Sequence, residues 1–306
     1  MAIYCKWFKE LSKWDTALIG RKAANLAELF NEKFPVPQGF VVTTNAFEAF
    51  LKDRGFYEKL TNSDLSAESI LNSSVSNELR EEIEEFYNYI DTAEELRDLK
   101  LANHLLKSGR DPPFVAVRPS HDGDLQISNR AVLLNKKGAA QVVRAVQECW
   151  ASLLSAKTAV VVQKQIDSEK SGVAHSANIN SNNNGEILLE AGWGIGKPET
   201  ANVYILDKNT GELKEKNILG QIFMYVRDEY TGKTLKKNVL PEKQKSQILT
   251  DFEIKNLHKL AIDIENYYGT PQEIEWAIAH GKIYLLRTKS IEATQKAKEV
   301  VANSEK

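Results

Sequence analysis

The pattern of apolar residues changes near residue 157. Before that point, segments with helical spacing such as 19–30 alternate with short apolar runs such as 39–44. After it, short apolar runs are separated by turn-forming strings such as NNNG and KNTG, which is typical of β-hairpins. This order predicts an α/β protein built from α+β lobes. We expect an N-terminal lobe over residues 1–157, a β-rich lobe over 158–290 and a polar tail over 291–306.

Composition excludes several classes of protein. Of the 306 residues, 42% are apolar and 27% are charged, and the net charge is -2, as in ordinary soluble domains. The sequence carries no polybasic stripe of the kind that binds nucleic acid, and its apolar runs are too short to cross a bilayer. Its N-terminus lacks the apolar segment of a signal peptide. We therefore expect a cytoplasmic protein that binds neither nucleic acid nor membrane.

Two glutamates near the C-terminus form the clearest candidate site. Glu273 and Glu275 lie two apart in a predicted strand, so both project from one face, while Ile274 and Trp276 face the core. Mg²⁺ prefers oxygen ligands and usually takes one or two carboxylates together with phosphates. By pattern alone, a solvated strand face is the commoner arrangement, and both interpretations remain open at this point.

Four segments, in order along most of the chain, carry a resemblance to a known family. They are LIGRKAANLAELF with FPVPQGFVVTTNAFEAF, then FVAVRPS, then QECWASLL through EILLEAGWGIGK, and finally YYGTPQEIEWAIAHGKIYLLRTKSI. In these segments the chain resembles the nucleotide-binding domain of the phosphoenolpyruvate synthase and pyruvate, phosphate dikinase family. The resemblance implies an ATP-grasp fold, in which two α+β lobes hold ATP.

The resemblance also implies roles for residues that bind the nucleotide. Lys22, after a glycine turn, and Arg118, at a strand end, would neutralise phosphate oxygens and serve catalysis. Gln163 would line the adenine side, and the carboxylate of Glu190 would lie near the ribose. For a lone Lys or Arg, a surface position is the usual alternative.

The closing hairpin would carry Mg²⁺ on Glu273 and Glu275, but it departs from the family pattern. Arg287 and Lys289 stand where the family has a glutamine and an arginine. We expect a three-residue loop, His280 to Lys282, which sets Glu275 opposite Arg287 and Glu273 opposite Lys289. Our hypothesis is that these two cations, which would also contact the nucleotide, take the metal's electrostatic role and weaken or abolish Mg²⁺ binding.

The loop after Arg118 departs from the pattern too. The family has a Ser, Thr, Ala and Gly-rich stretch there, whose backbone amides cover phosphates. Here Pro119 removes one amide donor, and Asp122 and Asp124 add negative charge. We also expect His175, in the string AHSAN, to be a packed strand residue rather than a phosphate acceptor.

The leading functional hypothesis is phosphoryl transfer from ATP to a histidine on a separate domain or chain. A partner chain would then carry the phosphohistidine domain and a pyruvate-binding TIM barrel, as the resemblance implies. The alternative is a catalytically degenerate pseudoenzyme that serves as a nucleotide-binding subunit or as a protein-interaction or regulatory subunit. An ATP-grasp ligase joining a carboxylate to an amine agrees less well with the strings.

Overall fold

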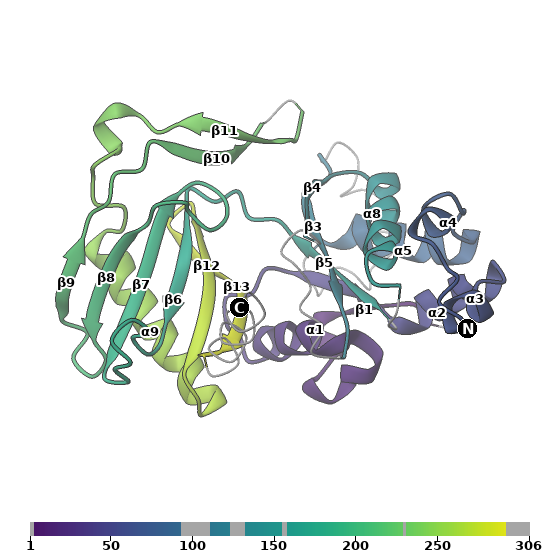
Figure 1. Ribbon diagram of the computed structural model, residues 1–306, viewed down its shortest axis with the longest axis horizontal. Coiled ribbons are helices and arrows are strands. Elements are labelled where there is room, and N and C mark those ends of the chain that lie inside the picture. The colour runs from purple at the N-terminus through teal and green to yellow at the C-terminus, as the bar shows by residue number, and fades with distance from the viewer. Residues whose placement is uncertain (1–2, 93–110, 123–131, 155–157, 229–230, 292–306) are drawn as a thin grey trace, which may run out of the picture. The chain divides into compact units, whose positions relative to one another are not determined.

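The chain divides into two compact units between Gln165 and Ile166. The computed structural model describes residues 3–92, 111–122, 132–154, 158–228 and 231–291 (Figure 1). The division lies beyond residue 157, the predicted boundary, because the strand Ala159–Lys164 pairs with two strands of the first unit. Of the predicted polar tail, only Ile291 lies within the described residues.

The first unit contains a five-stranded sheet in the order β1-β2-β5-β3-β4. Its strands are β1 (Cys5–Trp7), β2 (Gly39–Val42), β3 (Val115–Ser120), β4 (Leu133–Lys136) and β5 (Ala159–Lys164). Its α-helices are α1 (Thr16–Asn31), α2 (Thr44–Asp53), α3 (Tyr57–Thr61), α4 (Ala67–Leu71), α5 (Asn77–Tyr89) and α8 (Ala139–Ala151). The 3-10 turns Phe8–Glu10 and Lys13–Asp15 precede α1.

Both faces of this sheet are covered by helices. Val117 of β3 and Val162 of β5 belong to a core shared with α8, in which Trp150 stacks on Phe47 at a centroid distance of 5.4 Å. The helix α1 packs against β3 and β5 as well, and Figure 1 shows it on the other side of these strands from α8. Because β5 is central and covered on both faces, Val160, Val161 and Val162 are all fully buried.

Both cysteines, Cys5 and Cys149, are buried and free. Burial raises the pKa of the Cys149 thiol above its ordinary value, and the negative charge of Glu148 acts in the same direction. The thiol therefore stays protonated and packs as a small apolar group.

The second unit contains a six-stranded antiparallel sheet in the order β13-β12-β6-β7-β8-β9. Its strands are β6 (Lys170–His175), β7 (Glu186–Trp193), β8 (Asn202–Asp207), β9 (Leu213–Asn217), β12 (Gln272–Ala279) and β13 (Lys282–Ser290). The strands β10 (Phe223–Arg227) and β11 (Thr234–Asn238) form a separate two-stranded ribbon, and the 3-10 turn Pro241–Lys243 follows it.

One long helix, α9 (Asp251–Tyr268), packs on this sheet against β6, β7 and β12. It begins at a capping box, where the Thr250 hydroxyl accepts from the Glu253 amide and the Glu253 carboxylate accepts from the Thr250 amide. It ends at Gly269, whose φ of 68° is the left-handed conformation that glycine adopts at helix ends. Within the described ranges, no helix combines the length and apolar character needed to cross a membrane.

The register of the β12–β13 hairpin confirms both predicted cross-strand pairs. Glu275 lies opposite Arg287, and Glu273 lies opposite Lys289. The predicted three-residue loop is wrong, however, because Ala279 pairs with Lys282 and leaves a two-residue turn, His280–Gly281, with φ of 51° and 70°. The register shifts between Glu275 and Trp276, so that Leu286 is the extra residue on β13. The unpaired residue expected in the loop is thus a β-bulge within the strand.

Candidate functional site

A sharp break in α1 fixes the position of Lys22. Gly20 has φ of 74° and ψ of 158°, so the helix stops there and starts again at the next residue. The new start is bound to the end of β3, since the Arg21 amide donates to the His121 carbonyl at 3.1 Å and the Ala23 amide to Ser120 Oγ at 3.0 Å. Lys22 therefore lies in a first helical turn beside the last residues of β3.

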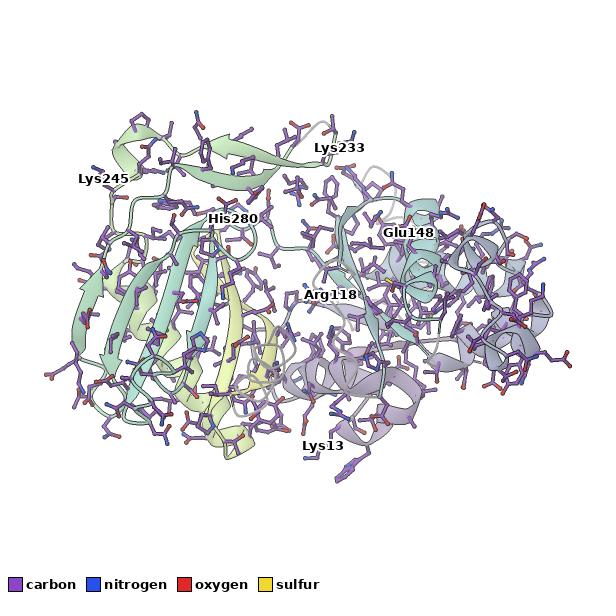
Figure 2. The ribbon with its side chains drawn as sticks, viewed as in Figure 1. Lys13, Arg118, Glu148, Lys233, Lys245 and His280 are labelled. Atoms are coloured by element: carbon purple, nitrogen blue, oxygen red, sulfur yellow. The ribbon has the colours of Figure 1, made fainter. Side chains whose placement is uncertain are left out.

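Arg118 lies on β3 close to the same junction (Figure 2). It pairs with Val161, and its side chain is half-buried on the same face of the strand as that of Ser120. Because Ser120 holds the amide next to Lys22, the structure brings the backbones of these two cationic residues together at one end of the first unit's sheet. The sequence predicts both residues as phosphate ligands, and their common location is consistent with that role.

The loop that departs from the family pattern is described only at its beginning. Pro119 and Ser120 belong to β3 and pair with Val160 and Ala159. Asp122 has the Arg21 guanidinium 3.9 Å away, so its negative charge is compensated locally. Asp124 and the rest of the loop lie outside the described residues.

Gln163 is a packed side chain of β5. It is 1% exposed, and its amide nitrogen donates to the Pro37 carbonyl at 3.2 Å. This bond connects β5 to the segment before β2. The sequence predicts Gln163 on the adenine side, and the structure shows its amide donor engaged in this internal bond.

Charged residues lie in line across the second unit's sheet, on the face away from α9. Residues that pair directly across antiparallel strands point to the same face, so one row contains Arg287, Glu275, Val173 and Glu190. The neighbouring row contains Lys289, Glu273, His175 and Leu188. On β12, Ile274 and Trp276 alternate with the two glutamates; both are 1% exposed and lie on the α9 face, as the alternation in the sequence predicts.

Arg287 and Glu275 form an ion pair. Nη1 of Arg287 lies 3.1 Å from Oε1 of Glu275, with the two side chains 31% and 38% exposed. Lys289 is directly opposite Glu273 in the register. On the other side of Glu273 lies His175, which is 3% exposed and therefore a packed strand residue, as expected.

The sequence does not predict the partner of Glu190. Nζ of Lys197 lies 3.8 Å from Oε2 of Glu190. Lys197 follows a glycine-rich loop after β7, and Gly194 and Gly196 both have φ of 87° there. A lysine directly after the second of two glycines is a weak signal, and only the folded loop shows which carboxylate it approaches.

The surroundings of Glu273 and Glu275 do not fit a magnesium site. One oxygen of Glu275 already receives the Arg287 guanidinium, and Glu273 faces the cation Lys289. Across the ranges that the structure describes, no three His, Cys, Asp or Glu side chains are grouped to hold a metal ion. Mg²⁺ at this position would have to displace or repel two positive charges.

The fold, with helices packed on the sheet of each unit, defines the class of the protein as α/β. Residues 16–306 match the pyruvate phosphate dikinase AMP/ATP-binding domain, and the chain belongs to that family. Its fold is the ATP-grasp fold of the dikinase nucleotide-binding domain, which confirms the fold predicted from the sequence.

Several proteins with known names are similar to this chain. It is 35% identical to the probable phosphoenolpyruvate synthase of Methanocaldococcus jannaschii, over 96% of this chain and 27% of that protein. It is 33% identical to the phosphoenolpyruvate synthase of Pyrococcus furiosus, over 99% of this chain and 46% of that protein. It is 28% identical to the rifampicin phosphotransferase of Bacillus cereus, over 93% of this chain and 35% of that protein. The chain thus spans less than half the length of these relatives.

Among solved structures, the D-alanine–D-alanine ligase of Helicobacter pylori matches 63% of this chain and 43% of its own, with 13% identity and a TM-score of 0.31.

Proposed function

We propose that this chain binds ATP and transfers a phosphoryl group from it to a histidine on a separate domain or chain. The observation that carries the proposal is the junction of β3 and α1, where Lys22 and Arg118 come together in a protein of the dikinase nucleotide-binding family. A triphosphate needs such cations, because its charge must be neutralised both on binding and as the phosphoryl group moves.

In this proposal, Arg118 holds phosphate oxygens with its planar guanidinium, and Lys22 follows the moving charge with a flexible ammonium group. Holding Lys22 at a restarted helix also directs the positive end of the helix dipole toward the phosphates. Catalysis is then mainly positioning and charge neutralisation. Glu190 stays a proposed contact of the ribose, and Gln163 contributes to the adenine side through the strand that it stabilises.

The acceptor histidine is proposed to lie outside this chain. His175 is buried in the sheet, so it is poorly placed to receive a phosphoryl group. The relatives named phosphoenolpyruvate synthase extend well beyond the region that matches, which leaves room in them for a phosphohistidine domain and a TIM barrel.

The test is calorimetric titration with ATP. We expect Lys22→Ala and Arg118→Ala each to weaken binding by about 10- to 100-fold, the usual effect of losing a hydrogen bond to a charged group. The matched controls are Lys52→Ala and Arg80→Ala, which remove cations from α2 and α5 and should leave the affinity unchanged. Equal losses in all four variants, or no binding by the native chain, would contradict the proposed site.

Transfer itself is tested with radiolabelled ATP and the part of the Pyrococcus furiosus relative that this chain does not span. Acid-labile, base-stable label on that part, dependent on the native chain, supports phosphoryl transfer to histidine.

A second candidate function is nucleotide binding without transfer. It is favoured by the ion pairs that occupy Glu275 and Glu190, since these place cations beside the acidic residues of the second unit. Binding of ATP together with an absence of transferred label is the result expected for such a pseudoenzyme.

A further inference from the structure

Three carboxylates on the face of the second unit's sheet away from α9 each have a cation beside them or opposite them in the register. The pairs are Glu275 with Arg287, Glu190 with Lys197 and, opposite each other in the register, Glu273 with Lys289. Summed over these six side chains, the charges cancel. A divalent cation is attracted to uncompensated carboxylates, and each of these three has a cation as its ion-pair partner or its cross-strand neighbour.

The position of Lys197 is set by the loop that carries it. The hydroxyl of Ser171 lies 2.7 Å from the Gly194 carbonyl and 2.6 Å from the Gly196 carbonyl. The Ile195 amide donates to the Tyr225 carbonyl at 2.8 Å. These contacts hold the loop at both of its positive-φ glycines and at the residue between them.

The loop then turns back over the sheet. A Cβ on Gly192 would lie 2.3 Å from the Cβ of Pro198, so the residue after Lys197 packs directly on the backbone of β7. Gly192 points to the same face as Glu190, two residues away on the strand. The loop therefore delivers Lys197 to the face that carries Glu190, and the pair is a consequence of the fold.

The hairpin places Arg287 in an equivalent way. The bulge at Leu286 together with the two-residue turn puts Arg287, rather than its neighbour, opposite Glu275. Two unrelated local devices, a folded loop and a β-bulge, thus bring a cation to a carboxylate on one face. Bulges often re-aim a side chain beside a functional site.

We propose that this face contacts the phosphates of a nucleotide without a divalent cation, with Lys197, Arg287 and Lys289 in place of the metal. The proposal rests on the nucleotide binding proposed above and adds Lys197 as a ligand of the phosphates. The three glutamates then serve as positioning residues, which hold the cations until phosphate oxygens share them.

The first experiment uses the metal alone. Mn²⁺ is titrated into the native chain and followed by electron paramagnetic resonance, with no nucleotide present. We expect Arg287→Gln combined with Lys289→Gln to bind Mn²⁺ at least about 10-fold more tightly than the native chain, because two carboxylates lose their cations. The control is Lys208→Gln, which removes a lysine paired with Glu265 of α9 at 3.0 Å, and which should not raise the affinity.

The proposal is overturned if the native chain binds Mn²⁺ at micromolar concentration and Glu275→Gln abolishes that binding. It is also overturned if the double variant gains no affinity, since the cations would then have no part in excluding metal.

The second experiment measures ATP binding with Mg²⁺ and with a chelator. We expect the two dissociation constants to agree within about threefold, and Lys197→Gln to weaken binding in chelator by about tenfold, while Lys208→Gln leaves it unchanged. Binding that requires Mg²⁺ would sink this inference and leave the proposed function standing. A complete absence of ATP binding in either condition would instead remove the proposed function and this inference with it.

Discussion

At Gly20 the chain takes φ of 74° and ψ of 158° inside a helical segment. A Cβ built there would lie 2.4 Å from the backbone nitrogen of His121 and 2.6 Å from Ser120 Oγ, closer than real Cβ atoms come to other atoms. We expect Gly20→Ala to destabilise the protein by about 1–3 kcal/mol or more, since backbone strain and a backbone clash add. The urea midpoint measures this loss. ATP affinity should fall as well, because the first turn that holds Lys22 must shift.

Gly55→Ala is the matched control for this prediction. Gly55 also has a positive φ, 66°, but no atom lies within 4 Å of its missing Cβ. The difference between the two variants therefore measures the close approach of Gly20 to β3 together with the cost of its ψ of 158°. Equal losses of stability, with unchanged ATP affinity in both, would show that this packing contributes little.

Individual residues differ in how far the sequence could predict their surroundings. Strand alternation is enough to predict that Trp276 is buried, and the family resemblance is enough to predict that His175 is a packed strand residue. It does not reveal that Glu190 meets Lys197, because that contact depends on positive φ angles in a glycine loop. Nor does it reveal that the Gln163 amide donates to Pro37, a residue 126 positions earlier. Contacts that depend on loop conformation or on distant segments are not encoded in local spacing.

Among the elements, the turn between β8 and β9 depends on one carboxylate. Asp207 accepts from the amides of Asn209 and Thr210, each at 3.0 Å, and Lys214 lies 3.0 Å from its other oxygen. The hydrogen bond from the Thr210 amide, followed by that from Lys214, lowers the pKa of Asp207 from 3.8 to about 2. Since the folded state binds the proton less tightly than the unfolded state, this contribution to stability is present above about pH 4 and disappears as the pH falls through about 2.

We therefore expect Asp207→Asn to be less stable than the native chain at neutral pH and to lose less stability on acidification. Urea midpoints between about pH 5 and pH 2 measure the difference, which should shrink as the pH falls. Asp263→Asn, which removes an exposed carboxylate of α9, should keep the native slope. Parallel curves for the native chain and Asp207→Asn would show that the turn does not depend on this charge.

The β12–β13 hairpin shows what the sequence can predict of an element. The number of residues between Glu275 and Arg287 is odd, so these two can pair only if one residue on the connection is left unpaired. Their pairing is predictable once both are placed on one face, but the unpaired residue could lie in the turn or in either strand. The structure puts it at Leu286, because His280–Gly281 already forms a two-residue turn with both φ angles positive.

At the scale of the whole molecule, the division into two units does not coincide with the change in sequence pattern. The string AVVV belongs to the β-rich sequence pattern that begins near residue 158. Yet β5 pairs with β2 and β3, so it is the central strand of the first unit. The local pattern identifies β5 as a strand. Its pairing with β2 joins segments more than 100 residues apart, and a local pattern cannot predict such a pairing.

This arrangement predicts different behaviour for two fragments of the chain. Residues 1–165 contain the whole five-stranded sheet with the helices on both faces, and we expect them to unfold cooperatively in urea, followed by circular dichroism. Residues 1–157 lack β5, the strand that lies between β2 and β3. Its loss leaves these two strands unpaired with each other and exposes the core that Val160 and Val162 fill. Burial of each valine contributes about 1.5–3 kcal/mol, and the cross-strand hydrogen bonds of β5 are lost as well, so this fragment should not fold.

A synthetic peptide of residues 158–165 added to the shorter fragment should restore part of the signal if β5 is what it lacks. Cooperative unfolding of residues 1–157 alone, at a midpoint close to that of the longer fragment, would place the boundary at residue 157 instead.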